Sequence, residues 1–387
     1  MEPQQTPFDR IPAWLRPFQR VTSGRSILTG IDGLRFIAIL GVVLFHFSND
    51  IYSFHASLGV PTDFAHSVLY FISKGGAGVA LFFCISGFIL YLPFLDLDRP
   101  VSLQSFYWRR VTRIEPPFII NIIICFAIAV HHLRVPIADM LPDLVKTLSY
   151  SNFLLDHKAS NLNSVTWSLE LEVQFYILLP LFASFIVRRI EMVRYFIYAT
   201  VIGIGVLLKI YGYESSAWTK YTLLGGIGYF FTGVIAADLW KNHWSKMSDG
   251  LYPDLFFLCG LAIWMIFATG EKISNLTYCW AFVGPIGFLG MICGALRGTV
   301  AKRILGFPFI WITGGMCYTI YLYHSFFGIG YHFVKRIGSG LPFAAYFCVQ
   351  SAILLPLVWG ASTVLFLLFE KPFMKKDWPK RVLSRFA

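Results

Sequence analysis

A histidine and an arginine share one face of the first long apolar stretch of the sequence. This stretch, residues 30–46, carries Asp32, Arg35 and His46 among apolar side chains. Each ionisable side chain costs about 3 kcal/mol in a bilayer core, so such groups usually face a cavity or a partner. Arg35 and His46 are eleven residues apart, which places them on one helix face about 16 Å apart along the axis. This face could bind an anion at one end and transfer protons at the other.

A carboxylate is expected at the level of His46. A lone histidine near a helix end is as often interfacial as functional, so its partners decide. The fourth apolar run opens with Trp167 and contains Glu170 and Glu172. A carboxylate there could orient an imidazole that acts as a general base. The two glutamates point about 200° apart on a helix, so only one of them can face His46.

A second histidine is a further candidate at this level. His324 follows Tyr321 in the ninth apolar run, in the half that we expect to lie towards the outer side of the membrane. A place in the packed core or in a gate is equally compatible with these residues. The sequence therefore leaves the role of His324 open.

Arginines gather just before the third apolar run, where we expect the cytoplasmic face. Arg110 and Arg113 are three residues apart, so on a helix they share a face and could clasp a phosphate with their guanidinium groups. The alternative is that they only anchor the topology, as cytoplasmic arginines commonly do. Arg35 is expected at the same inner level. The order of the segments alone thus predicts an inner site for a phosphorylated donor and an outer site with a base.

Three other features of the sequence are less specific. The second apolar run opens with glycines at 75, 76 and 78 but lacks the Gly-Lys-Ser/Thr of a phosphate loop, so we expect close helix packing there and a kink at Ser86 and Gly87. Glu370, at the inner end of the last run, could pair with an inner arginine or lie at the surface. The seven cysteines form no Cys-x-x-Cys pair, so no metal site is predicted.

The composition predicts an all-α polytopic membrane protein. Hydrophobic residues make up 56% of the chain, charged residues only 14%, and the mean hydropathy is +0.63. The net charge of +11 is spread over short clusters between apolar runs, which argues against nucleic acid as a partner. We expect about ten transmembrane helices, near residues 27–48, 68–94, 115–132, 166–187, 195–211, 221–240, 253–270, 277–296, 307–331 and 343–369.

The distribution of basic residues predicts that both termini are cytoplasmic. With ten spans and a cytoplasmic N-terminus, the inner segments carry 22 Lys and Arg and the outer segments carry 9. We therefore divide the chain into a cytoplasmic segment 1–26, which is not a cleavable signal peptide, a transmembrane domain 27–370, and a basic cytoplasmic tail 371–387. The longest outer stretch, about 133–165, is expected to form a lid or an amphipathic segment.

Six groups of residues, in order along nearly the whole chain, resemble the motifs of the acyltransferase 3 family of membrane acyltransferases. Two positions depart from the family pattern: Cys317 stands where a serine is usual, and Glu172-Val173 stands where two acids are usual. The matching motifs are Asp32-Gly-Leu-Arg35 with His46, Gly78-Val-Ala-Leu-Phe-Phe with Ser86-Gly-Phe88, Arg110-Val-Thr-Arg113-Ile-x-Pro116, Trp167-Ser-Leu with Glu172-x-Gln-Phe-Tyr176, Tyr318-x-x-Tyr-Leu-x-His324, and Glu370-x-Pro372-Phe.

The resemblance implies a membrane enzyme that transfers an acyl group, most often acetyl from acetyl-CoA, to sugars of lipopolysaccharide, exopolysaccharide, Nod factors or macrolides. It implies His46 as the catalytic residue, with Glu172 in the place of its acid partner. It also implies Arg35, Arg110 and Arg113 as the residues that serve the acyl-CoA, no metal, and a location in the bacterial cytoplasmic (inner) membrane. No soluble domain follows in this sequence, so we expect the transfer to be completed within the membrane domain.

We therefore expect acyl transfer from cytoplasmic acyl-CoA to a sugar hydroxyl of a surface or secreted glycan, with His46 as general base. Direct transfer and an acyl-histidine intermediate both remain open. One alternative is an acyltransferase that acts on a small glycosylated metabolite. Another is a transporter or flippase for a glycolipid or acyl group, which intramembrane charges and about ten spans would also suit. A purely structural membrane partner would leave the inner arginines and the outer histidine unexplained.

Overall fold

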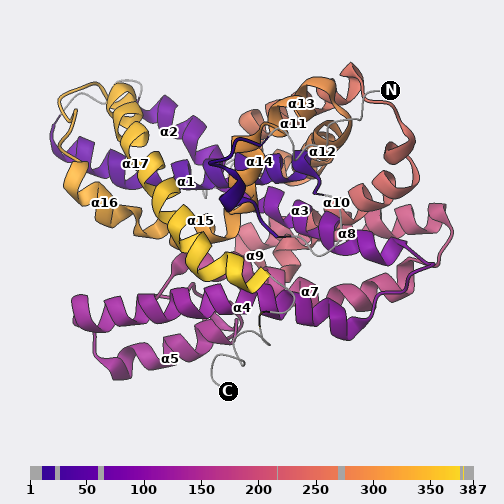
Figure 1. Cartoon of the computed structure of the whole chain (residues 1–387), viewed down its shortest axis with the longest axis horizontal. Coiled ribbons are helices and arrows are strands. Elements are labelled where there is room, and N and C mark those ends of the chain that lie inside the picture. Colours follow the sequence, from indigo (N-terminus) through magenta and orange to yellow (C-terminus); the bar gives the residue numbers. More distant parts are fainter. Residues whose placement is uncertain are drawn as a thin grey trace.

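The computed structural model describes residues 11–21, 27–59, 65–215, 217–268, 275–374 and 378, and these fold almost entirely into helices (Figure 1). Within these ranges the β pairing is limited to one isolated bridge between Gly250 and Gly298. Eight described helical segments are long and apolar enough to cross a membrane: Thr29–Ser57, Ser67–Leu95, Leu103–His132, Ser164–Ile186, Glu191–Gly212, Trp218–Lys246, Tyr278–Arg297 and Phe343–Met374. The prediction of an all-α polytopic membrane protein is confirmed.

The α-helices follow the expected apolar runs in order. Each of the eight segments above coincides with one of the ten predicted spans. The helices are α1 (Thr29–Ser57), α2 (Ala65–Ser73), α3 (Gly78–Tyr91), α4 (Leu103–Ala127), α5 (Ile137–Leu148), α6 (Asn152–Leu155), α7 (Trp167–Ile186), α8 (Glu191–Ser215), α9 (Ala217–Lys220), α10 (Leu223–Asn242), α11 (Leu251–Phe267), α12 (Asn275–Arg297), α13 (Thr299–Leu305), α14 (Pro308–Gly315), α15 (Cys317–Tyr323), α16 (Phe327–Val334) and α17 (Phe343–Leu365).

Two of the ten predicted spans differ from the others. The run 253–270 forms α11, which has 17 residues and is shorter than the spanning helices. The run 307–331 is not one helix but three, α14, α15 and α16, with a 3-10 turn at His324–Phe326 before α16. Hydropathy did not predict these interruptions, because the run is apolar throughout. Irregular backbone at membrane depth is tolerated only where protein groups satisfy it, so the break needs polar partners.

Helix α1 lies in the middle of the molecule, against α3, α12, α13, α14 and α17. Small residues allow the close approach on two of its sides. A Cβ on Gly75 would lie 2.2 Å from the carbonyl oxygen of Gly41, and one on Gly314 would lie 1.8 Å from that of Asp32. The prediction that the glycines of residues 75–78 serve close helix packing is therefore confirmed, and α14 is pressed directly against the start of α1.

A second set of helices, α3, α7, α8 and α10, packs beside α1 around an aromatic core. The rings of Phe83 and Phe175 both stack on that of Phe230, at centroid distances of 4.7 and 4.2 Å. A Cβ on Gly87 would lie 2.0 Å from the carbonyl oxygen of Phe230, which brings α3 against α10. Helix α3 runs unbroken through Ser86 and Gly87. The predicted kink therefore does not interrupt α3, and Gly87 serves the close packing of α3 on α10.

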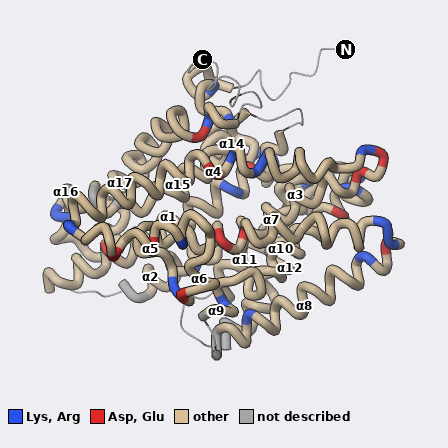
Figure 2. The backbone as a smooth tube through the Cα atoms, turned by 90° about the horizontal axis from the view of Figure 1, so that it is seen from below, with Lys and Arg blue, Asp and Glu red and all other residues tan. Residues whose placement is uncertain are grey.

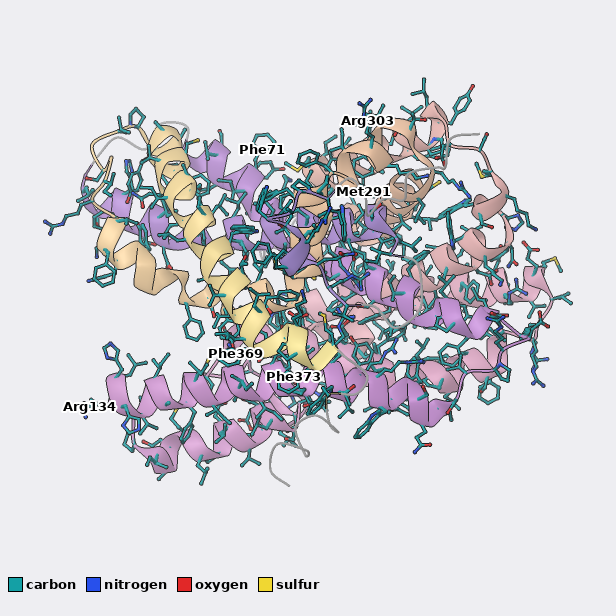
Figure 3. The ribbon with its side chains drawn as sticks, viewed as in Figure 1. Phe71, Arg134, Met291, Arg303, Phe369 and Phe373 are labelled. Carbon is teal, nitrogen blue, oxygen red and sulfur yellow. The ribbon has the colours of Figure 1, made fainter. Side chains whose placement is uncertain are left out.

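The stretch 133–165, which we expected on the outer side, folds back on α4 and contains the amphipathic helix α5, one of the two forms that the sequence predicted. In Figure 1, α4 and α5 run antiparallel along the lower left of the molecule, and Figure 3 places Arg134 at the tip of this hairpin. On the polar side of α5, Asp143 accepts hydrogen bonds from the Ser160 hydroxyl at 3.0 Å and the Asn161 amide at 3.0 Å. The opposite side of α5 exposes Ile137, Leu141 and Val145.

Candidate active site

The first turn of α1 holds a buried carboxylate between two arginines. Asp32 lies in the first turn of α1, where the helix dipole favours an acid. Its Oδ1 accepts a hydrogen bond from Nη1 of Arg35 at 2.7 Å, and its Oδ2 accepts one from Nε of Arg20 at 2.9 Å. Asp32 is fully buried, and the side chains of Arg20 and Arg35 are 12% and 13% exposed. Asp32 therefore holds two guanidinium groups in place at one end of the helix.

Two more arginines reach the same place from α4. The guanidinium of Arg110 lies over the ring of Phe106, 4.5 Å from its centroid. Arg113, one turn further on, makes no hydrogen bond or ion pair with the described part of the chain, and its charge interacts with those of Arg20 and Arg110. Figure 2 shows blue segments gathered between α4 and α14. The structure thus brings Arg35, Arg110 and Arg113 together, and adds Arg20 to them.

Glu172 lies at this arginine end and not beside the histidine. It accepts a hydrogen bond from the hydroxyl of Ser86, and its charge interacts with those of Arg35 and Arg110. No hydrogen bond joins Glu172 to His46 in the described chain, since the ring of His46 bonds elsewhere. The prediction that Glu172 partners His46 is therefore not matched by a contact, and the structure joins two candidates, Ser86 and Glu172, that the sequence had not paired.

The packing of α3 on α1 explains why Ser86 and Glu172 lie near the start of α1. The two helices run antiparallel, with Gly78 against Ala38. Ser86 lies eight residues beyond Gly78, which is about 12 Å further towards the start of α1. The other acid of α7, Glu170, accepts hydrogen bonds from the backbone amides of Asn152 and Phe153 at 3.2 and 3.1 Å. It fixes the short helix α6 and is also not a partner of His46.

Further along α1, eleven residues before the helix ends at Ser57, His46 meets His324 from the broken segment. Nε2 of His324 lies 3.2 Å from Nδ1 of His46, and the ring centroids are 4.8 Å apart. Nδ1 of His324 lies 2.8 Å from the carbonyl oxygen of Tyr321 and 3.2 Å from that of Ile320. Nδ1 of His46 lies 2.9 Å from the carbonyl oxygen of Val42. His324 is fully buried, whereas His46 is half-buried.

These contacts decide where the hydrogens of the two neutral rings lie. Carbonyl oxygens only accept hydrogen bonds, so Nδ1 of His324 must carry the hydrogen and its Nε2 must accept. Nδ1 of His46 therefore donates, both to His324 and to the carbonyl of Val42. The lone pair of His46 is then on Nε2, the outward nitrogen of the less buried ring. A neutral imidazole held in one tautomer, with a free basic nitrogen, is the form that a general base requires.

Polar side chains satisfy the backbone where the helix breaks around His324. The carbonyl of Leu322 accepts hydrogen bonds from the side-chain amides of Asn121 at 3.1 Å and Asn163 at 3.0 Å. At the start of α15, Glu370 accepts from the backbone amide of Thr319 at 3.2 Å and from its hydroxyl. Glu370 is fully buried. Glu370 thus caps the start of α15, the helix that leads to His324. The alternative that Glu370 lies at the surface is wrong.

Two further candidates serve as supports in this region. The hydroxyl of Tyr321 donates to the carbonyl of Val165 at 2.5 Å and accepts from the Ser168 hydroxyl at 3.1 Å. This ties the broken segment to the start of α7. The ring of Trp167 packs edge-on against Phe83, with a centroid distance of 6.4 Å. Neither side chain touches His46.

One protein family matches most of this chain. The acyltransferase domain of the acyltransferase 3 family matches residues 28–370. The chain belongs to this family. Both the arginine cluster of α1 and α4 and the histidine pair lie within the matched range, whereas Arg20 lies outside it. No solved structure matches the acyltransferase 3 chain significantly.

Curated relatives of the acyltransferase 3 chain come from Staphylococcus aureus. A protein of strain MRSA252, whose designation as an O-acetyltransferase is provisional, is 25% identical over 93% of this chain and 60% of its own length. The O-acetyltransferase OatA of strain NCTC 8325 is 22% identical over 77% of this chain and 50% of its own length. The chain thus spans between half and three fifths of the length of these relatives.

Four residues of the acyltransferase 3 site were missed by the sequence analysis. Asn121 and Asn163 carried a weak signal, since amide side chains within or beside apolar runs need partners. Asp50 follows His46 by four residues, so the two share a helix face, and their charges interact. Arg20 carried no signal, because it lies in a segment without apolar periodicity.

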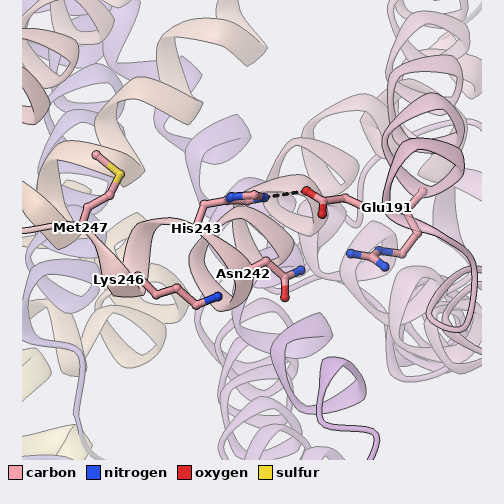
Figure 4. A pocket seen from close by; sticks show the side chains of 6 residues that line it. Glu191, Asn242, His243, Lys246 and Met247 are labelled. Carbon is pink, nitrogen blue, oxygen red and sulfur yellow. Dashed lines mark hydrogen bonds and ion pairs between the residues drawn. The ribbon is translucent and has the colours of Figure 1, made fainter.

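A separate hollow of about 720 Å³ lies between α8 and α10, lined by Glu191, Arg194, Asn242, His243, Lys246 and Met247 (Figure 4). Nε2 of His243 lies 2.6 Å from a carboxylate oxygen of Glu191. Arg194 forms two hydrogen bonds with the buried carboxylate of Asp238, at 2.7 and 2.9 Å. His243 and Arg194 are thus each engaged by an acid, and this hollow includes none of the residues of the arginine cluster or the histidine pair.

Proposed function

We propose that this chain is an integral-membrane O-acyltransferase that moves an acyl group from cytoplasmic acyl-CoA to a sugar hydroxyl of a surface or secreted glycan, such as lipopolysaccharide O-antigen or exopolysaccharide. The observation that carries the proposal is the contact between His46 and His324, which assigns the hydrogen of His46 to Nδ1 and leaves Nε2 as its basic nitrogen. The family match and the O-acetyltransferase relatives support acyl transfer, with acetyl as the group.

The arginine cluster is suited to the phosphates of the donor. Guanidinium groups form paired hydrogen bonds with phosphate, and Arg35 and Arg113 have N–H groups that no described protein group accepts. Arg35 lies about 16 Å along α1 from His46, a distance that an extended pantetheine arm spans. The excess of basic residues in the inner segments supports cytoplasmic termini in a bacterial cytoplasmic membrane, with the arginines on the side where acyl-CoA is made.

The base then acts at the point where donor and acceptor meet. The hydroxyl oxygen of the sugar forms a bond with the acyl carbon while its proton passes to Nε2 of His46. The C–S bond of the thioester breaks, and the thiolate of CoA takes a proton back from His46, so the histidine is regenerated. In a two-step route Nε2 attacks the acyl carbon first. Both routes begin at the same lone pair, and trapping of an acylated protein under rapid quench separates them.

Mass spectrometry of glycans tests the proposal. Surface and secreted glycans are compared between cells with the wild type, cells with His46→Ala and cells without the gene. An acyl mass increment that appears only with the wild type is expected, and its mass identifies the group. Identical glycans in all three, with folded protein present in the membrane, would contradict transfer to a glycan. A small-molecule acceptor is then tested by the same comparison on glycosylated metabolites.

A flippase that performs no chemistry is the rival in a different class. It predicts that His46→Ala reduces the export of a glycan whose acylation is otherwise unchanged. The enzyme predicts the reverse, unchanged export with loss of the acyl group. Both quantities are measured in the same cells, so one experiment decides between the two functions.

A further inference from the structure

The segment 11–21 precedes the family match and yet reaches into the arginine cluster. Nε of Arg20 bonds to Asp32 at 2.9 Å, and the charge of Arg20 interacts with those of Arg35 and Arg113. Nη1 and Nη2 of Arg20 make no hydrogen bond with the described part of the chain. One edge of the guanidinium is thus fixed by Asp32, while the terminal N–H groups remain available for a further acceptor.

The segment is seated on the membrane domain by apolar contacts. Ile11 and Leu15 are buried in a cluster with Trp311 and Ile312 of α14. The ring of Phe18 packs edge-on against Trp359 of α17 at 6.3 Å. These contacts place the segment across α14 and α17, immediately beside the start of α1.

Two further contacts hold segment 11–21 on the membrane domain. Lys371 donates a hydrogen bond to the carbonyl of Pro17. A Cβ on Gly315 would lie 3.3 Å from Cδ of Arg20, so the glycine leaves room for the arginine stem to pass along α14. The position of Arg20 is therefore built by at least three elements of the domain and does not depend on the ion pair alone.

We propose that Arg20 is a donor-binding residue, which the packing of segment 11–21 on α14 and α17 holds at the site for the phosphorylated part of acyl-CoA. The inference rests on the proposed function. Its physical basis is that the guanidinium groups of Arg20, Arg35 and Arg113 lie close together. After Asp32 has accepted one hydrogen bond each from Arg20 and Arg35, these guanidinium groups still have N–H groups that can donate to a ligand. A ligand with several phosphates supplies the acceptors, and each charge-assisted bond to a phosphate oxygen is among the stronger hydrogen bonds in proteins.

Equilibrium binding of free CoA to the purified full-length protein in lipid nanodiscs tests this inference. Free CoA carries the phosphates but no acyl group, so no turnover occurs. We expect Arg20→Gln to weaken CoA binding at least tenfold. The matched control is Arg16→Gln in the same segment, because Nε of Arg16 bonds to the carbonyl of Ile11 and not to Asp32. Arg16→Gln should bind CoA as the wild type does.

Arg20→Lys separates binding from folding. Lysine keeps the charge and the ion pair with Asp32 but lacks the planar fork, so we expect a melting temperature like that of the wild type with CoA affinity still reduced. In acyl transfer, Arg20→Gln should raise KM for acyl-CoA with kcat nearly unchanged. Wild-type affinity in Arg20→Gln would overturn the role of Arg20 and leave the proposed function standing. A wild type that binds no CoA would overturn the proposed function, and this inference with it.

Discussion

Two levels of α1 hold their polar side chains by different means. At the first turn, charged groups from the N-terminal segment and α1 share the buried Asp32, and arginines from α4 lie beside them. At the level of His46, in the interior of the helix, the partners are a neutral imidazole and backbone carbonyls, with amides of Asn121 and Asn163 behind them.

The difference teaches how one helix can serve two tasks. Surplus guanidinium groups attract an anion but would suppress a base, because a nearby cation disfavours protonation of an imidazole. About 16 Å of helix keeps the arginines away from His46. Substitutions near the first turn of α1 should therefore change donor binding or stability, whereas substitutions at the level of His46 should change kcat. The predictions below test that contrast, from the largest expected effect to the smallest.

The largest effect is expected from His46→Gln. Glutamine keeps a polar side chain of similar size but supplies no basic nitrogen, so acyl transfer should fall about 10³-fold with donor affinity retained. Acyl transfer and CoA binding are measured on the same purified protein. The control is His131→Gln, since His131 is an exposed histidine at the end of the α4 segment. A loss of CoA binding as large as the loss of transfer would place His46 in the donor site, and would contradict the separation of donor binding from the base.

The next effect concerns how much the ion pairs of Asp32 stabilise the protein. Asp32→Asn leaves two mostly buried guanidinium groups without their carboxylate, so the free energy of unfolding should fall by about 3 kcal/mol. Thermal unfolding in nanodiscs measures the change. Asp249→Asn is the matched control, because Asp249 is 40% exposed and pairs with Arg297 and Lys302 at the surface. Such a pair contributes about 0–1 kcal/mol, so similar losses in both variants would mean that Asp32 is not the centre of a buried cluster.

A third effect concerns the tautomer of His46. In His324→Phe nothing accepts the Nδ1 hydrogen of His46 except the Val42 carbonyl, so kcat should fall about tenfold to 100-fold while KM for the donor stays the same. His324→Gln offers an amide oxygen as acceptor and should restore most of kcat. Equal activity of the glutamine and phenylalanine variants would show that His324 only fills space.

Much of the arginine cluster at the first turn of α1 could be predicted from the sequence, because helix periodicity and segment order are local properties. Apolar runs and their order gave the level of Arg35 and Arg113, and the i, i+3 spacing on α4 placed Arg110 with them. Arg20 could not be predicted, since its position depends on the packing of segment 11–21 against α14 and α17.

The histidine end was harder to predict, because it depends on depth and on contacts between distant segments. His46 and His324 are 278 residues apart in sequence. Their contact requires the break between α15 and α16, which hydropathy does not reveal. For the same reason the sequence placed Glu172 at the level of His46, whereas the structure joins it to Ser86. An apolar run gives the order of residues along a helix but not how far that helix is shifted along its neighbours.

Glu172→Gln is the smallest effect expected and the sharpest test of that shift. Glu172 bonds to Ser86 and its charge interacts with Arg35 and Arg110, so its removal should alter KM for acyl-CoA several-fold. Its effect on kcat should be small, because no contact joins it to His46. Steady-state kinetics with varied donor measure both constants, and Ser86→Ala should change KM in the same way.

The opposite result would have a specific meaning. If Glu172→Gln lowered kcat as far as His46→Gln does, with KM unchanged, Glu172 would have to approach His46 during catalysis. Helix α7 would then move along α1 by about 24 Å, because the Ser86 level and His46 each lie about 12 Å from the level of Ala38, on opposite sides of it. The aromatic stack of Phe175 on Phe230 and the tie between Tyr321 and Val165 hold α7 against such a movement. The structure therefore predicts that the two levels of α1 act through separate residues, and that Glu172 acts with the arginines.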